Sequence, residues 1–152
     1  MNDVLVLMEI VTLAIVSALA VYEANPSVFY VGSAHGGVWK TTNNGATFTP
    51  QFQNEGLISI GAIAVSQKDP DLVWVGTGEG NPRNSVSFGD GVYRSNDGGQ
   101  TWQRIDTGRD RHYTWGLAVD PNDSDCWFIS ACPGPTPFSG PILNPCHACG
   151  IG

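Results

Sequence analysis

The hydrophobic positions of this chain fall into short segments, and three of these segments align with one another. They are ALAVYEANPSVFYVGS (18–33), AIAVSQKDPDLVWVGT (62–77) and GLAVDPNDSDCWFISA (116–131). The second follows the first by 44 positions, and the third follows the second by 54 positions. A repeat of roughly 40 to 50 residues with strand-like content is typical of a propeller or another repeat array.

A second pair of matching segments follows the first two copies of the repeat. Residues 36–48 (GGVWKTTNNGATF) align with residues 90–102 (DGVYRSNDGGQTW), 54 positions later. Because the offset grows from 44 to 54, the second copy carries ten extra residues between Val75 and Val92. This insert belongs to the stretch GEGNPRNSVSFGDG (78–91).

Each copy of the repeat predicts four short strands, which in the second copy lie near 60–66, 72–78, 91–95 and 100–105. Alternating and β-branched residues mark these strands, and Asn-Pro or Asp-Pro pairs mark the turn between the first two. Four antiparallel strands make a blade whose two faces must be covered by neighbouring blades. The predicted fold is therefore all-β, a partial β-propeller of four-stranded antiparallel blades with irregular N- and C-terminal segments.

The repeat also sets the expected division of the chain. We expect a leader (1–12), a first blade (13–52), a second blade (57–106) with the loop insert 78–91, the first half of a third blade (114–132) and an irregular tail (133–152).

Residues 4–22 form the longest apolar run in the chain. A signal peptide begins with basic residues, whereas this run follows Asp3 and the first basic residue is Lys40. Glu9, Thr12 and Ser17 weaken an assignment as a membrane span. Because the second half of the run matches a strand of the repeat, we expect a buried strand behind the leader and no membrane association.

The composition agrees with a globular chain rich in turns. Of its 152 residues, 41% are hydrophobic and 14% are charged, with 19 Gly, 10 Pro and 5 Trp. This balance favours short aromatic strands joined by turns. The formal net charge is −7 and no cluster of Lys and Arg occurs, so we expect no nucleic-acid partner.

Two segments resemble the Asp-box, Ser-x-Asp-x-Gly-x-Thr-Trp, of the bacterial neuraminidase repeat. SNDGGQTW (95–102) matches it closely, and TTNNGATF (41–48) is a softened copy. We expect a structural role for these residues. An Asp or Asn accepts backbone hydrogen bonds within the turn, a Gly adopts a backbone conformation that a side chain would oppose, and an aromatic residue packs beneath the hairpin. The residues concerned are Ser95, Asp97, Gly99, Thr101 and Trp102, and in the softened copy Thr41, Asn43, Gly45, Thr47 and Phe48.

The stretch from about 18 to 131 resembles bacterial sortilin-like and Asp-box propellers, relatives of the xyloglucan-hydrolysing glycoside hydrolases. The resemblance implies a secreted or cell-envelope protein whose whole propeller has six or more blades. In the xyloglucanase relatives, the catalytic base is an Asp just ahead of a Gly-Gly-x-aromatic strand. Here that stretch reads SAHGGVW with Ala34 at the position of the Asp, so we expect no complete hydrolase site and no catalytic residue.

Polar residues near the insert are the main candidates for ligand binding, because binding residues collect in loops on a rigid scaffold. An alternative is that Glu79 and Arg83 pair locally and hold the shape of the loop. His112, within the stretch 109–115, is a further candidate for the same face, again with a solvated loop as the alternative. The candidates for a glycan or peptide ligand are Glu79, Asn81, Arg83, Asn84, Asp90, His35 and Trp39.

The last 27 residues hold all four cysteines, Cys126, Cys132, Cys146 and Cys149. Cys146 and Cys149 have the C-x-x-C spacing, but their distance from the other two fits no common zinc module. We therefore expect neither a metal nor a cofactor, and we expect Cys126 to be a core residue. Five prolines after residue 131 interrupt the repeat and disfavour pairing of the tail with a sheet.

Two functions are compatible with these patterns. The first is a segment of an extracytoplasmic propeller that binds or scaffolds a protein, peptide or glycan. The alternative is part of a secreted glycoside hydrolase whose active site is incomplete in this chain, a reading that Ala34 disfavours. Fewer than three whole blades leave apolar faces open, so we expect self-association or marginal stability in the isolated chain.

Overall fold

The computed structural model describes residues 16–79, 87–108 and 112–132 and the backbone of residues 147–148. The predicted leader (1–12) lies outside the described residues. In the described parts, every regular element is a strand, and all strand pairings are antiparallel. The predicted all-β class is confirmed. Within the same residues, we find no helix with the length and apolarity needed to cross a membrane.

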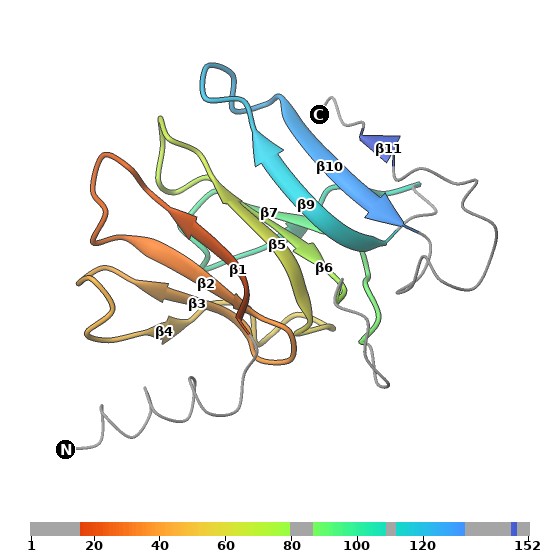
Figure 1. Ribbon diagram of the computed structural model, residues 1–152, viewed down its shortest axis with the longest axis horizontal. Coiled ribbons are helices and arrows are strands. Elements are labelled where there is room, and N and C mark those ends of the chain that lie inside the picture. Colours follow the sequence, from red (N-terminus) through yellow and green to blue (C-terminus); the bar gives the residue numbers. More distant parts are fainter. Residues whose placement is uncertain (1–15, 80–86, 109–111, 133–146, 149–152) are drawn as a thin grey trace.

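The strands form three sheets that follow one another along the chain (Figure 1). The first sheet has the order β1 (Val16–Val21), β2 (Phe29–Ser33), β3 (Gly37–Thr41), β4 (Thr49–Pro50). The second has the order β5 (Ile60–Val65), β6 (Val73–Thr77), β7 (Val92–Ser95), β8 (Gln103–Arg104). The third has the order β11 (His147–Ala148), β10 (Trp127–Cys132), β9 (Tyr113–Val119). The first two sheets are thus the four-stranded antiparallel sheets that the repeat predicts.

The third sheet differs from the expectation in one respect. The proline-rich tail was expected not to pair, yet β11 pairs with β10 through Ala131 opposite His147 and Ser130 opposite Ala148. The pairing is possible because β11 begins after Pro145, the last of the five prolines. β11 occupies the place beside β10 that β3 and β7 occupy beside β2 and β6.

The register of the strands repeats with the sequence. In each sheet, the first strand carries one extra residue relative to the second strand, a β-bulge. The bulged residues are Ser17, Gly61 and Trp115, which stand at the same position of the repeat. The repeat seen in the sequence is therefore a repeat of backbone geometry.

Two apolar clusters hold the three sheets together, one in each gap between neighbours. The first joins residues of β1–β3 and Phe52 to the facing side of the second sheet, and the second joins Trp74 and Val92 to Trp127, Ile129 and Ala131. β6 belongs to the second sheet, which lies between the other two, and it is buried at all five positions. Its continuous apolar sequence is explained by neighbours on both faces.

A glycine in the second strand of each of the first two sheets lets the next sheet approach closely. A Cβ on Gly76 would lie 2.2 Å from Thr114 Cγ2, and one on Gly32 would lie 2.6 Å from Ile60 Cγ2. Gly32 and Gly76 occupy one position of the repeat, and Ile60 and Thr114 occupy another. The same contact is therefore made twice, between consecutive sheets.

We predict that Gly76→Ala destabilises the protein by about 1–3 kcal/mol, because the added methyl group overlaps the side chain of Thr114. Urea unfolding followed by tryptophan fluorescence measures the change. Gly56→Ala is the matched control, since no atom lies within 4 Å of the added Cβ. We expect it to change stability by less than about 0.5 kcal/mol. Equal stability of the two variants would contradict the close contact between the second and third sheets.

Candidate functional site

The strand order places the candidate residues at two opposite ends of the sheets. The loops β2–β3 and β6–β7 share one end with the connections between sheets, and we call it the insert end. The hairpins β3–β4 (41–48) and β7–β8 (95–102) lie at the other end, which we call the turn end (Figure 1). The predicted binding residues and the predicted structural turns are thus separated by the length of the strands.

At the insert end, His35 and Glu79 come together from neighbouring sheets. Each follows the second strand of its sheet, and the two are 44 residues apart, so they stand at the same position of the repeat. His35 Nδ1 lies 3.8 Å from Glu79 Oε2. The side chain of His35 is 48% exposed, whereas that of Glu79 is fully buried. The imidazole is therefore the part of this pair that a ligand can reach.

Ser87 joins the same group and was not singled out from the sequence. Its Oγ lies 2.6 Å from His35 Nε2, on the side of the ring opposite to Glu79. The backbone N–H of Glu79 donates to the carbonyl of Ser87 at 3.3 Å. Its neighbour Gly78 donates to the carbonyl of Ser59 at 2.9 Å. The two ends of the insert are thus tied to each other through Glu79 and Ser87, and Ser87 joins them to His35.

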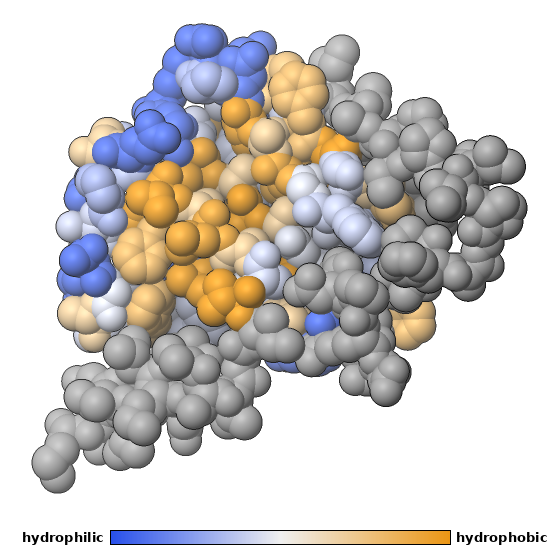
Figure 2. Space-filling model, in the orientation of Figure 1, coloured by the Kyte–Doolittle hydropathy of each residue, from blue (hydrophilic) through white to orange (hydrophobic). Residues whose placement is uncertain are grey.

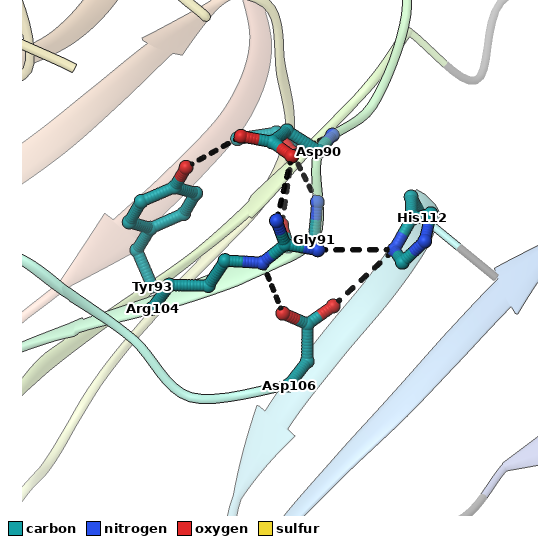
Figure 3. Close-up of polar contacts among 7 residues, drawn as sticks. Asp90, Gly91, Tyr93, Arg104, Asp106 and His112 are labelled. Carbon is teal, nitrogen blue, oxygen red and sulfur yellow. Dashed lines mark hydrogen bonds and ion pairs between the residues drawn. The ribbon is translucent and has the colours of Figure 1, made fainter. Parts of the chain in front are cut away.

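Asp90, at the end of the insert, belongs to a second polar group (Figure 3). It accepts hydrogen bonds from the hydroxyl of Tyr93 at 2.8 Å and from Arg104 Nη1 at 2.8 Å. Its backbone N–H donates to Thr77 Oγ1 at 2.7 Å. Burial, followed by the bond to Asp90, raises the pKa of Tyr93 to about 12. Both carboxylate oxygens of Asp90 are therefore already bonded to side chains of the protein.

Arg104 links Asp90 to a buried carboxylate. Its Nε donates to Asp106 Oδ1 at 2.8 Å, and His112 Nδ1 lies 3.5 Å from Asp106 Oδ2. The side chain of Asp106 is fully buried, while that of Arg104 is 37% exposed. The hydrogen bond to Asp106 is the largest cause of a raised pKa at Arg104, which keeps the guanidinium charged. Arg104 and Asp106 were not predicted, because nothing in their spacing marks them as partners.

The remaining predicted binding residues are placed differently. Trp39 lies on β3, and its indole N–H donates to the carbonyl of Gly36 at 2.7 Å within its own hairpin. Asn81, Arg83 and Asn84 lie outside the described residues, so the local pair between Glu79 and Arg83 stays a prediction. Ala34, at the position where the xyloglucanase-like pattern has an Asp, is buried.

At the turn end, the hairpin 95–102 is closed by the side chains of Ser95 and Asp97. Ser95 Oγ donates to Asp97 Oδ1 at 2.7 Å and accepts the backbone N–H of Gly99 at 2.8 Å. Asp97 accepts the backbone N–H of Thr101 at 2.8 Å and the hydroxyl of Thr101 at 2.6 Å. Gly99 has a φ of +96°, which a side chain would oppose. These bonds tie the turn into one rigid unit.

The hairpin 41–48 repeats this arrangement with an amide in place of the carboxylate. Thr41 Oγ1 donates to Asn43 Oδ1 at 3.0 Å and accepts the backbone N–H of Gly45 at 3.0 Å. Asn43 Oδ1 accepts the backbone N–H of Thr47 at 2.9 Å, and Asn43 Nδ2 donates to Thr47 Oγ1 at 2.8 Å. Only this last bond differs in direction from its equivalent in the hairpin 95–102, where the hydroxyl of Thr101 donates to Asp97. The direction reverses because the amide nitrogen of Asn43 is a donor.

The aromatic residues of the two hairpins have different partners. Trp102 meets Phe52 edge to face at 5.1 Å between ring centroids and donates its indole N–H to the carbonyl of Gln51 at 2.7 Å. Trp102 therefore joins the second sheet to the first. Phe48, at the equivalent position, contacts Phe29 at 5.9 Å within its own sheet.

The cysteines and acidic residues give no metal site in the part of the chain that the structure describes. Cys132 is disulfide-bonded, and Cys146 and Cys149 lie outside the described residues. The prediction that Cys126 belongs to the core is wrong. It stands just before β10, is half-buried and free, and belongs to neither apolar cluster.

The comparisons with known proteins identify the fold. No family model and no curated protein matches the chain. Among solved structures, it is similar to a GH74 enzyme of Niastella koreensis (TM-score 0.60, 23% identity), covering 82% of this chain and 18% of that one. It is also similar to an ancestral GH74 enzyme (0.57, 20%, covering 76% and 16%). A third match is the GH74 xyloglucanase from Xanthomonas campestris (0.57, 19%, covering 78% and 18%).

The chain therefore spans less than a fifth of the length of these enzymes. At such identities the likeness shows the fold alone. Together with the three antiparallel sheets, it identifies the chain as a partial β-propeller.

We predict that Asp97→Asn, which copies the amide of Asn43, lowers stability by about 1 kcal/mol at neutral pH. The hydroxyl and backbone N–H of Thr101 lower the pKa of Asp97 to about 2. The usual value is about 3.9, so this stabilisation is complete above about pH 4 and is lost as the pH falls toward 2. The difference between the two proteins should therefore narrow over that range, as measured by urea unfolding at several pH values. A difference that does not change between pH 4 and pH 2 would argue against the carboxylate bonds.

Proposed function

We propose that this chain is a segment of an extracytoplasmic Asp-box propeller, of the sortilin-like and xyloglucanase-like kind, that acts in binding or scaffolding. Its ligand is a glycan, a peptide or a protein segment bound at the insert end. The observation that carries the proposal is the meeting of His35, Ser87 and Glu79, which come from two consecutive sheets. Nucleic acid and membrane are not expected as partners, given the net charge of −7.

The chemistry of this group suits a polar ligand. The imidazole of His35 offers a half-exposed polar ring whose two nitrogens face Ser87 and Glu79, and the hydroxyl of Ser87, which shares one hydrogen bond with His35 Nε2, can make a further one. The buried carboxylate of Glu79 lies 3.8 Å from Nδ1, the ring nitrogen that does not contact Ser87. Because the two parts belong to separate sheets locked together by packing, the group is held in place before a ligand arrives.

Two further observations support the Asp-box and extracytoplasmic parts of the proposal. The hairpins 41–48 and 95–102 share one set of bonds from a hydroxyl and an Asp or Asn side chain. This is the structural task assigned to the Asp-box. Cys132 is disulfide-bonded, and disulfides persist in oxidising compartments such as the periplasm or the extracellular space.

A second candidate function is part of a secreted glycoside hydrolase, because the solved neighbours are GH74 enzymes. Such hydrolysis needs two carboxylates facing a sugar across a cleft. At the insert end, however, Ala34 stands at the position of the expected Asp, and Asp90 and Asp106 are bound to Arg104. A catalytic site in the parent protein would therefore need residues beyond this segment.

We predict that the purified chain binds a glycan or peptide through His35. The probes are an array of xyloglucan and β-glucan oligosaccharides and an array of unrelated peptides. His35→Ala should weaken the binding of any retained probe about tenfold or more, equivalent to about 1.4 kcal/mol. Thr49→Ala, an exposed change on β4, is the matched control and should bind as the wild type does.

Two results would count against this function. One is the absence of binding to either array, and the other is unchanged binding by His35→Ala. Hydrolysis of xyloglucan or β-glucan by the full-length parent, abolished by replacing one carboxylate, would favour the hydrolase instead.

A further inference from the structure

The contact between Ser87 and His35 is short. Ser87 Oγ lies 2.6 Å from His35 Nε2, within the range of a hydrogen bond between a hydroxyl and a ring nitrogen. The two residues are 52 positions apart, His35 in the loop between β2 and β3 and Ser87 near the end of the insert. A hydroxyl within hydrogen-bond reach of an imidazole is the arrangement of a nucleophile and its general base.

A carboxyl group lies beside the other nitrogen of the same ring. Glu79 Oε2 is 3.8 Å from His35 Nδ1, which is too long for a hydrogen bond but within the distance of an ion pair. The order of the three groups is therefore hydroxyl, imidazole, carboxyl, as in the triad of serine hydrolases. Only the first two are in hydrogen-bond contact, so the nucleophile and the base are the parts on which the inference rests.

The residue after Ser87 adds an apolar surface to this group. The side chain of Phe88 is 72% exposed. Its ring lies 6.3 Å from that of Tyr113, at an angle of 54° between the two planes. The ring of His35 is itself 48% exposed, so both the hydroxyl–imidazole contact and an apolar ring are open to a molecule from solvent. A substrate with a small apolar group suits this pairing better than a purely polar one.

We propose that Ser87 is a nucleophile with His35 as its general base, and that this group hydrolyses carboxylic esters with a small apolar acyl chain. In the tautomer that leaves Nε2 unprotonated, Ser87 Oγ attacks the ester carbonyl carbon, its proton passes to Nε2, and the carbonyl electron pair moves onto the carbonyl oxygen. The oxygen returns this pair, the bond from carbon to the alcohol oxygen breaks, and the alcohol leaves with the proton from Nε2.

Water completes the reaction by the same route. It attacks the acyl carbon of the acyl-serine and gives a proton to Nε2, and the bond from carbon to Ser87 Oγ then breaks. Oγ takes the proton back from Nε2, so one ester and one water give one acid and one alcohol. The reaction goes beyond the binding proposed above and does not depend on a glycan or peptide ligand, because its substrate is an ester.

A serine at the opposite end of the sheets is the matched control. Ser27 lies between β1 and β2, and its carbonyl accepts the backbone N–H of Asn44 in the hairpin 41–48 at 3.0 Å, which places it at the turn end. Figure 2 shows hydrophilic residues gathered at this end, over the β5–β6 and β9–β10 turns. Its described hydrogen bonds involve Asn25 and Asn44 and no histidine.

Labelling with a fluorophosphonate tests the nucleophile, because this reagent modifies serines that a base activates. Mass spectrometry of the digested 152-residue chain should find the label on Ser87. Ser87→Ala should remove the label, and His35→Gln should slow labelling about a hundredfold or more, the contribution typical of a general base. Ser27→Ala should be labelled as fast as the wild type. Neither Ser87 nor His35 is buried, so circular dichroism should show that all variants remain folded.

Hydrolysis of p-nitrophenyl butyrate tests the complete reaction. The wild type should release more than one equivalent of p-nitrophenol per chain, and Ser87→Ala and His35→Gln should each lower the rate about a hundredfold or more. Phe88→Ala should raise KM for the butyrate more than for the acetate, because the longer acyl chain has more apolar surface to place on the ring.

Three results would overturn the proposal: no label on Ser87, labelling that His35→Gln leaves unchanged, or release that stops at one equivalent. Retention of a glycan or peptide through His35 by a chain that is not labelled at Ser87 would also overturn it, while leaving the proposed binding function in place.

Discussion

The close stacking of consecutive sheets is the interaction on which the rest of this structure depends. A sheet of this repeat is apolar on both faces, so it is stable only with a neighbour on each side. Gly32 and Gly76 allow the neighbour to approach, and Ile60 and Thr114 fill the space. β6 belongs to the second sheet, which has a described sheet on each side, and it is buried throughout.

The same stacking explains the bonds that cross from sheet to sheet at the turn end. Tyr30 of β2 and Lys40 of β3 both donate to the carbonyl of Gly98 in the next sheet, at 3.2 and 3.0 Å. The ammonium of Lys40 also lies 5.3 Å from the centre of the Tyr30 ring. Arg94 lies at the same distance from the ring of Trp74, at the equivalent positions one sheet later. Different side chains thus make one cation–π contact because the backbone repeats.

The features that could be predicted from the sequence are those that the repeat shows twice. Strand positions and the residues of the two hairpins follow from local patterns, such as the spacing of Ser95 and Asp97, whose bonds span only a few residues. Ser87 and the pair of Arg104 and Asp106 could not be predicted. Their contacts depend on the path of the insert, which has no counterpart in the first copy, and on the connection to the third sheet, whose residues differ from those of the equivalent connection in the first copy. The pairing of β11 was missed because the prolines before it dominate the local pattern.

The two copies differ most at the insert end, and that difference bears on function. Phe52 of the first copy packs on Tyr93 at 5.2 Å, whereas Asp106, at the equivalent position, is a buried charge bound to Arg104. Burying a charge is costly unless it is paired. Replacing the aromatic ring by the paired carboxylate of Asp106 therefore does not strengthen the packing between sheets. In the same way, Glu79 replaces His35 at one position of the repeat. Stacking needs none of these polar groups, and their gathering at one end of the sheets is the feature on which the proposed binding function rests.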